Sequence, residues 1–400
     1  MPNVSRRSLV KGTALAGAAM AAAGLAGCSG NAGEDSTPQF SGEPQVITDD
    51  SKIIDVTDSY ESVEDTMEAQ FAWELPVGTV PFHSGGSWAA LLMAPESASS
   101  VNTLGVISLV SGNWNTLVAK PTQGNSFGFH DVRCGDNVFA WVEMDYTSGV
   151  WVLIAQEMSN GELRGDAVQL DKGNIDWEPA RLTATNDAVI WQKMPMATGS
   201  KRSEHSHCLI WSVGDSESTE VFESPGRFAT YPRNCEGILT IAPRVKADEG
   251  TFYGITALDL QNDFKILDQM VMPETVRPFE AVYMGSSFAF AVEANYGYGG
   301  SLGSMGSFIG REDGPFVTVP REPLACIAGK GSRYLVKVRS SYFVLDTDKQ
   351  TLGYLSAPDK TLEYGDYPAS EGTTDRFVTY ATVRGDDGLA ASVLLRVFAL

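Results

Sequence analysis

A repeat of about fifty residues runs through most of the chain and constrains the fold more than any other feature. Each copy contains a tight polar or glycine turn followed by an apolar strand, as in GGSWAALLMA, GDNVFAWVEM and GSSFAFAVEA. The first apolar residues of the copies are Trp88, Val138, Ala188, Ile238, Phe288, Tyr334 and Phe377, so the spacings are 50, 50, 50, 50, 46 and 43 residues. Such periodicity is typical of solenoids, propellers and arrays. The sequence therefore predicts seven copies of one structural unit.

Each complete copy holds four short apolar runs separated by turns. In the second copy we expect strands at about 127–133, 137–144, 150–157 and 166–170. Short apolar runs bounded by Gly, Asn, Asp and Ser indicate strands, and four strands at this period resemble the blade of a β-propeller. The predicted fold class is all-β, a seven-bladed β-propeller of four-stranded blades over residues 70–400. A pair of β-sandwiches is the alternative, but it would not explain the near-constant spacing.

The last copy is one strand short. It has expected strands at about 365–370, 376–383 and 390–398, while a spare strand at Gln70–Leu75 precedes the first copy. We predict that this N-terminal strand joins the C-terminal blade and closes the ring, which would remove two exposed sheet edges. The architecture resembles extracytoplasmic propellers of the Tol-associated or quinoprotein-like type. Neither the WD dipeptide, the kelch double glycine nor the tryptophan docking motif recurs regularly, so no specific family fingerprint is present.

Residues 1–27 have the layout of an export signal. Arg6 and Arg7 precede an Ala/Gly/Leu run that is too short and too weakly apolar for a good membrane span. The segment Ser5–Lys11 resembles the twin-arginine export motif, and Leu25–Cys28 resembles the lipobox of bacterial lipoproteins. The resemblance implies cleavage before Cys28, a lipid on its thiol, and attachment to the outer face of the cytoplasmic membrane or the cell envelope. A plain secretory signal with an accidental cysteine is the alternative.

Two segments separate the leader from the repeats. Residues 28–44 are rich in Gly, Ser and Pro and are expected to form a flexible tether, with a reach of roughly 20–25 Å. Residues 45–69 form an acidic N-terminal extension. The pattern does not decide whether this extension packs on the repeats.

The charge balance excludes one class of partner. Acidic residues outnumber basic ones by 50 to 29, which gives a formal net charge of −21. A strongly acidic surface repels phosphate backbones, so we expect no nucleic-acid partner. The expected partners are the membrane, through the lipid on Cys28, and an unknown envelope protein or glycan.

Propeller topology sorts the loops between two faces. The connections between blades, and those between second and third strands, share one face, and they include the long segments 194–207, 244–250 and 293–306. The turns on the opposite face are nearly all short. Long, individual loops on a rigid scaffold are where binding sites are usually built. We therefore expect any site on the long-loop face, at the mouth of the central channel.

Polar and aromatic residues lie at or near the predicted starts of the innermost strands, where they would line the channel. They are His83, His130, Asp131, Trp177, Glu178, Tyr231, Arg233, Arg277, Glu280, Arg321, Glu322, Asp366 and Tyr367. Such a set suits a polar ligand or an ordered cluster of water. Tyr296 and Tyr298 lie in a glycine-rich loop that would suit recognition or would be a floppy insertion.

Histidine and cysteine give weaker signals. His205 and His207 are weak metal candidates because imidazoles at alternate loop positions can face one ion; solvated loop histidines are the favoured interpretation, and no metal site is predicted. Cys134, Cys208, Cys235 and Cys326 are expected to be buried thiols. Cys208 with Cys235 is the disulfide that neighbouring blades would allow.

No catalytic motif is present among the GxSxG, P-loop, HExxH and calcium-loop patterns. We expect a non-catalytic scaffold that binds a ligand or a protein partner. One alternative is an enzyme acting on carbohydrate or cell-wall polymer through Glu178, Glu280 or Asp366, because glycosidases work with paired carboxylates. The other is a redox protein with an unknown cofactor taken up before export.

Overall fold

The computed structural model describes residues 42–64, 67–95, 97, 100–339, 341–356 and 366–400, which belong to one compact unit, Gln39–Leu400. Within these residues the only α-helix is the single turn α2 (Val56–Ser59). No helix in the described part of the chain is long and apolar enough to cross a membrane. Arg6, Arg7, Cys28 and most of the tether lie outside the described residues, so export and lipidation stay predictions.

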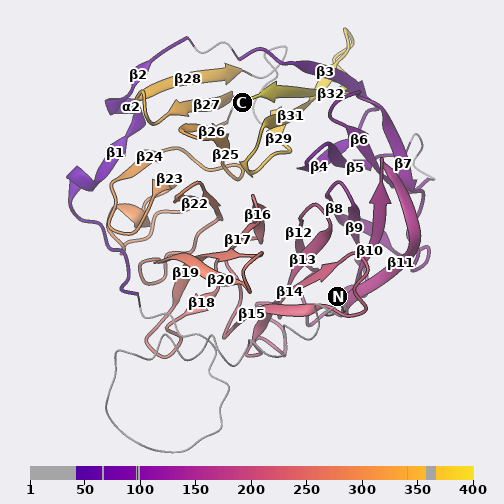
Figure 1. The fold of residues 1–400 in the computed structure, drawn as a ribbon, viewed down its shortest axis with the longest axis horizontal. Helices are drawn as coiled ribbons and strands as arrows, with labels where there is room; N and C mark the ends of the chain where they lie inside the picture. The colour runs from indigo at the N-terminus through magenta and orange to yellow at the C-terminus, as the bar shows by residue number, and fades with distance from the viewer. Residues whose placement is uncertain (1–41, 65–66, 96, 98–99, 340, 357–365) are drawn as a thin grey trace, which may run out of the picture. The chain divides into compact units, whose positions relative to one another are not determined.

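The described strands form seven sheets, numbered here in chain order (Figure 1). The first sheet holds β4 (Val80–Gly85), β5 (Trp88–Met93), β6 (Thr103–Ser108) and β7 (Trp114–Val118). The second holds β8 (Gly128–Cys134), β9 (Val138–Asp145), β10 (Val150–Ser159) and β11 (Glu162–Gly173), and the third holds β12 (Arg181–Ala184), β13 (Ala188–Lys193), β14 (Ser206–Ser212) and β15 (Thr219–Ser224). The fourth holds β16 (Arg233–Cys235), β17 (Ile238–Ile241), β18 (Arg244–Val245), β19 (Phe252–Asp259) and β20 (Lys265–Val271).

The remaining sheets each contain strands from distant parts of the chain. The fifth holds β21 (Glu280–Met284), β22 (Ser287–Val292), β23 (Gly306–Gly310), β24 (Phe316–Val319) and the N-terminal β1 (Ile53–Asp55). The sixth holds β25 (Ala328–Lys330), β26 (Arg333–Lys337), β27 (Ser341–Asp346) and β28 (Thr351–Ser356), flanked by β2 (Glu61–Ser62) and β30 (Gly372–Thr373). The seventh holds β29 (Asp366–Pro368), β31 (Arg376–Arg384), β32 (Ala390–Ala399) and β3 (Phe71–Leu75).

The hydrophobic core lies between neighbouring sheets. One cluster joins Ala90 and Val106 of the first sheet to Val132 and Trp141 of the second. A central strand such as β9 is buried on both faces from Val138 to Glu143, which is why Val138–Val142 is a continuous apolar run. The sheets are arranged around a centre (Figure 1). The predicted all-β propeller is confirmed, and the strands of the second sheet match the expected ranges, although β11 is longer than expected.

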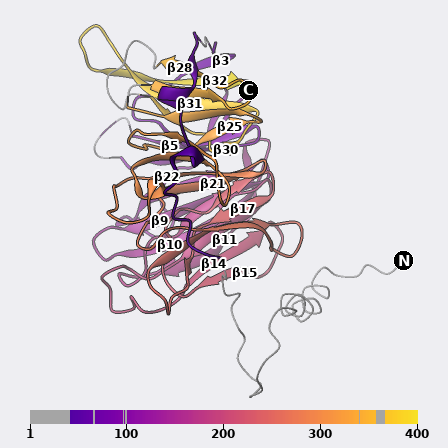
Figure 2. The same cartoon turned by 90° about the vertical axis from the view of Figure 1, so that its left-hand side faces the viewer.

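The N-terminal extension, which the sequence left unassigned, runs along the outer rim of the sheets. We call its described residues 45–64 together with β3 the strap. The amide of Gln45 donates to the carbonyl of Val271 at 2.9 Å. Further on, β1 pairs with β24 and β2 with β28, both parallel, and β3 pairs antiparallel with β32. Figures 1 and 2 show the strap passing these outer strands in turn. It covers outer edges that would otherwise be open to pairing.

A turn of the seventh sheet reaches across the centre. Between β29 and β31 the chain forms β30, which pairs in parallel with β25 of the sixth sheet. The amide of Thr373 donates to Cys235 Sγ of the fourth sheet at 3.0 Å. A Cβ atom at Gly372 would lie 3.0 Å from Val282 of the fifth sheet. This turn therefore touches three sheets besides its own.

Candidate functional site

A buried ion triad lies at the centre of the sheets. Arg233, on β16, donates to Glu280, on β21, through Nη2 at 2.8 Å and Nε at 3.1 Å. Its other terminal nitrogen pairs with Glu371, from the turn that carries β30. The Arg233 side chain is only 8% exposed. Burial raises the pKa of Glu280 although Arg233 opposes the rise, and the two carboxylates hold the pKa of Arg233 well above its usual value against its own burial.

Three further arginines gather beside this triad, and we call Arg181, Arg227 and Arg277 the arginine cluster. Glu178 accepts from Arg181 at 3.1 Å and also pairs with Arg227. The carbonyl oxygen of Ala229 lies 3.5 Å from Arg181 Nη1 and 3.3 Å from Arg277 Nη2. Burial lowers the pKa of Arg181, and the charges of Arg227 and Arg277 add to that effect, while Glu178 opposes it.

Tyr231 joins the cluster to the triad. The guanidinium of Arg181 lies 5.1 Å from the centre of its ring and that of Arg233 lies 5.5 Å from it. A guanidinium group over an aromatic ring is a favourable arrangement because the face of the ring is electron-rich. Burial is the first cause of a raised pKa for Tyr231, so its hydroxyl stays protonated at neutral pH.

Asp131 and Arg133 form a second buried pair, on β8. The Asp131 carboxylate also accepts from the amide of Val132 at 2.8 Å. Burial raises the pKa of Asp131, and Arg133 opposes the rise. His130, the preceding residue, is 3.2 Å from the Tyr146 hydroxyl through Nδ1, and burial lowers its pKa.

The structure therefore brings together several of the predicted channel residues. Those joined by contacts or by mutual electrostatic effects are Asp131, Glu178, Tyr231, Arg233, Arg277 and Glu280. They come from the second to the fifth sheet: Asp131 lies within β8, and the others lie at or before the starts of β12, β16 and β21.

Other predicted residues lie elsewhere. Trp177 is half-buried, with the Lys193 and Lys201 ammonium groups 5.5 and 5.2 Å from its ring centre. Arg321 and Glu322 are exposed, and Arg321 donates to the carbonyl of its neighbour Pro320. Tyr367 lies near Lys337 and Tyr380. The side chains of His83 and Asp366 lie outside the described residues.

The glycine-rich loop is partly anchored. The amide of Tyr296 donates to the carbonyl of Gly303 at 2.8 Å, and Gly300 forms a bridge with Ile47 of the strap. Tyr298 is 78% exposed. The backbone of the loop is therefore anchored at two points, and the Tyr298 side chain is exposed, so the loop is not a floppy insertion throughout.

His205 and His207 point to different carboxylates. His205 Nδ1 is 2.5 Å from Glu223, and His207 Nδ1 is 2.7 Å from Glu220. No cluster of three or more His, Cys, Asp or Glu suited to a metal ion occurs among the residues that the structure describes. The two histidines are thus held separately, each by an acid on β15.

The cysteines are buried within the sheets. Cys208 and Cys235 are both free thiols, so the disulfide considered for them is not formed. Burial raises the pKa of Cys235 and raises that of Cys326 well above its usual value, which makes both poor nucleophiles.

Four residues of the site were missed by sequence reasoning: Arg133, Arg181, Arg227 and Glu371. Arg133 and Arg181 lie two and three residues beyond predicted residues, so extending each candidate segment along its strand would have found them. Arg227 lies in a connection between sheets, and Glu371 lies in a turn assigned to the opposite face. Nothing in their local sequence signals a role at the centre.

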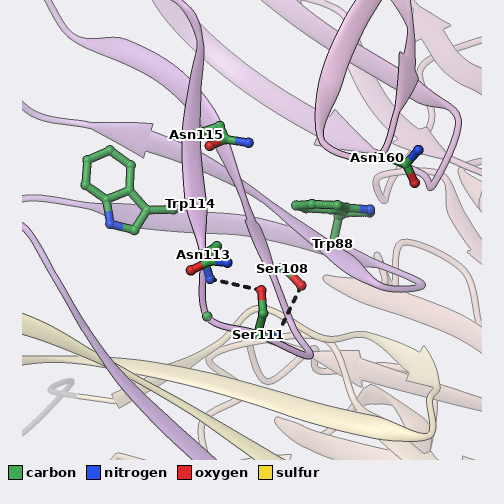
Figure 3. Close-up of a pocket in the computed structure, with 8 residues that line it drawn as sticks. Trp88, Ser108, Ser111, Asn113, Trp114, Asn115 and Asn160 are labelled. Carbon is green, nitrogen blue, oxygen red and sulfur yellow. Dashed lines mark hydrogen bonds between the residues drawn. The ribbon is translucent and has the colours of Figure 1, made fainter.

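A separate hollow of about 570 Å³ lies at the outer part of the first two sheets (Figure 3). Its lining residues are Trp88, Ser108, Ser111, Gly112, Asn113, Trp114, Asn115 and Asn160. Figure 3 shows Trp88 and Trp114 on opposite sides of β7. The hollow involves the turn between β6 and β7 and the turn between β10 and β11. It is therefore built from short turns, and sequence reasoning, which looked to the long loops, missed it.

The ion pairs limit the chemistry that the centre can perform. Glu178 and Glu280 are each bound to arginine, and both carboxylates of the triad share Arg233. A general acid or base must be able to exchange a proton with substrate, whereas these carboxylates are engaged by arginine side chains. The arrangement suits recognition of a polar ligand better than acid–base catalysis.

Comparison with known proteins shows the fold alone. No protein-family model matches the sequence, and no curated protein matches it. A prolyl endopeptidase structure aligns with 80% of this chain and 47% of its own, at 13% identity and a TM-score of 0.54. The β-propeller domain of the Trilobed protease from Pyrococcus furiosus aligns with 82% of this chain and 94% of its own, at 10% identity and a TM-score of 0.50. A puromycin hydrolase structure aligns with 82% of this chain and 53% of its own, at 14% identity and a TM-score of 0.50.

This chain spans about half the length of the prolyl endopeptidase and puromycin hydrolase chains that it matches. The structural neighbours are mostly propeller domains of peptidases, and at such low identity their activities do not transfer. The common element is the β-propeller.

Proposed function

We propose that this chain is an exported, lipid-anchored β-propeller that binds a ligand or protein partner at the channel mouth and the adjoining long-loop face. The observation that carries the proposal is the convergence of Glu178, Arg181, Arg227, Tyr231 and Arg277 from separate sheets. Convergent polar groups from several elements on a rigid frame are the usual basis of a binding site. The export and lipidation motifs at Arg6, Arg7 and Cys28 support the envelope location.

We also propose that the seven sheets act as seven blades of a closed ring. The pairing of β3 with β32 supports this view, because five residues at the N-terminal side, Phe71–Leu75, complete the sheet formed by the last part of the chain. A ring held by its own two ends would give the channel residues fixed positions. A ring of six blades is the competing count.

The binding proposal is tested with purified full-length protein in detergent. Thermal-shift and direct-binding assays against cell-wall glycans and purified envelope proteins should find a ligand whose affinity falls in Tyr298→Ala, on the long-loop face. Tyr354→Ala is the matched control, because Tyr354 is also exposed but lies on the outer strand β28. A ligand bound equally well by both variants, or no ligand at all, would contradict the proposal.

The hollow in Figure 3 favours a second candidate function, contact with an uncharged glycan. Two tryptophans and three asparagines line it, and no charged residue is among its lining residues. Trp114 is 41% exposed, so its removal should cost little stability. Trp114→Ala should weaken binding to a neutral cell-wall glycan if this candidate is correct, whereas Tyr298→Ala should leave that binding unchanged.

A further inference from the structure

The arginine cluster carries more positive charge than its partners neutralise. Arg181 and Arg227 share one carboxylate, Glu178, and the contact of Arg277 is a backbone carbonyl. The neighbouring acids are already engaged, since Glu280 and Glu371 bind Arg233, and Asp131 binds Arg133. A local cationic excess therefore lies within a chain whose net charge is −21.

Two arginines of the cluster, Arg181 and Arg277, converge on a common point. Arg181 comes from β12 and Arg277 from the segment before β21, yet both terminal nitrogens lie within 3.5 Å of the Ala229 carbonyl oxygen. Two guanidinium groups brought this close repel each other, and the lowered pKa of Arg181, due first to burial, includes a contribution from Arg277. Binding an anion between them would remove that repulsion.

Neighbouring residues fix the positions of Arg181 and Arg227, while Arg277 remains accessible to solvent. The Arg181 guanidinium is held against the Tyr231 ring, and Arg227 also contacts the carbonyl of Pro195. Arg277 is exposed, so a solute can reach the cluster. The Thr230 hydroxyl, next in sequence to Tyr231, is buried without a hydrogen-bond partner among the described groups. Preorganised donors with an open side are typical of a ligand site.

We propose that Arg181, Arg227 and Arg277 bind the anionic group, carboxylate or phosphate, of a small organic ligand. Guanidinium groups present paired N–H donors that match the paired oxygens of either group. Arg277 would close over the ligand from the solvent side, while Arg181 and Arg227 would contact it from within. This inference rests on the proposed function, because it assigns a ligand class to the same channel mouth.

The test is calorimetric titration of the full-length protein in detergent with inorganic phosphate and, separately, with succinate at low ionic strength. We expect saturable binding of at least one of them, and the tighter of the two identifies the chemical source of the anion. Arg277→Gln should weaken it at least about tenfold, because hydrogen bonds to charged groups are strong. Arg384→Gln is the matched control: Arg384 is also exposed and donates to a backbone carbonyl, that of Gly388, but lies on β31. The affinity of Arg384→Gln for the anion should stay within twofold of that of the parent protein.

The outcomes separate this inference from the proposed function. No saturable binding of either anion, or equal binding by Arg277→Gln and the parent, would overturn the anion site. If a glycan or protein ligand is then still lost in Tyr298→Ala, binding at the long-loop face stands without an anionic ligand. If neither anion nor any other ligand binds, both ideas fail. Arg181→Gln provides a second variant, and near-ultraviolet circular dichroism shows whether it remains folded.

Discussion

Replacing Arg233 with methionine should lower the free energy of unfolding by about 3–5 kcal/mol at neutral pH, because removing one member of a buried ion group leaves charges without a partner. Here two carboxylates, Glu280 and Glu371, would be stranded in a site where the arginine is only 8% exposed. For roughly 330 residues of propeller, the unfolding entropy is about 0.7 kcal/mol/K, so the melting temperature should fall by about 4–7 °C. Differential scanning calorimetry and urea unfolding measure both quantities.

The stability loss of Arg233→Met should be smaller at low pH than at neutral pH. Burial raises the pKa of Glu280 above its usual 4.5 in the folded protein, and Arg233 limits the rise. A folded pKa above the unfolded one contributes stability that is present at low pH and is lost as pH rises through the folded pKa. Without Arg233 the pKa of Glu280 in the folded protein rises further. Protonation of Glu280 should therefore reduce the stability loss of Arg233→Met as pH falls from 7.5 towards 5. The free energy of unfolding of the variant should therefore differ most from that of the parent at neutral pH.

Two controls make the prediction specific. Arg164→Met removes an exposed arginine paired with Glu162, and it should change stability by less than about 1 kcal/mol. Adding Glu280→Gln and Glu371→Gln to Arg233→Met removes the stranded charges and should restore much of the loss. A deficit below about 1 kcal/mol for Arg233→Met, or one that is equal at pH 5 and pH 7.5, would refute the account of the triad.

Three further predictions concern the leader, the sheet packing and the metal question. Cys28→Ser should move the protein from the membrane fraction to the soluble fraction, measured by fractionation and immunoblotting; retention on the membrane would contradict lipidation. Gly135→Ala should destabilise by roughly 1–3 kcal/mol in urea unfolding, since its Cβ would lie 1.8 Å from the Thr185 carbonyl oxygen, whereas Gly297→Ala, with open space, should be neutral. The purified protein should show no visible absorbance band and no stoichiometric transition metal by mass spectrometry, and His205→Ala should not change that result.

The strand pattern could be predicted because its causes are local. The run from Val138 to Val142 is apolar on both faces of the sheet, and a turn of Gly, Asp and Asn precedes it, so neither property depends on distant residues. The predicted ranges for the second sheet accordingly differ from β8, β9 and β10 by one or two residues at most. The fourth strand deviates more: β11 runs from Glu162 to Gly173, and its register with β10 shifts at two places.

The strap and the triad could not be predicted because their causes are non-local. The short run Lys52–Val56 could be a strand from its sequence, but nothing in it or in β2 indicates a partner, and β1 and β2 pair with residues about 260 and 290 positions away. Glu371 reaches Arg233 only because a turn of the seventh sheet extends across the centre. The arginine excess likewise depends on tertiary contacts, because Glu178 pairs with both Arg181 and Arg227.

The strap also determines how the propeller would respond to force applied at its N-terminal end. Tension would load the Gln45–Val271 contact first, then the three-residue pairing of β1, the two-residue pairing of β2, and last the five-residue pairing of β3. A pull directed away from the rim separates such pairs one after another instead of shearing them together. The short pairings would yield before the sheets themselves were loaded, so the strap would act as an extensible link between the N-terminal end and the propeller.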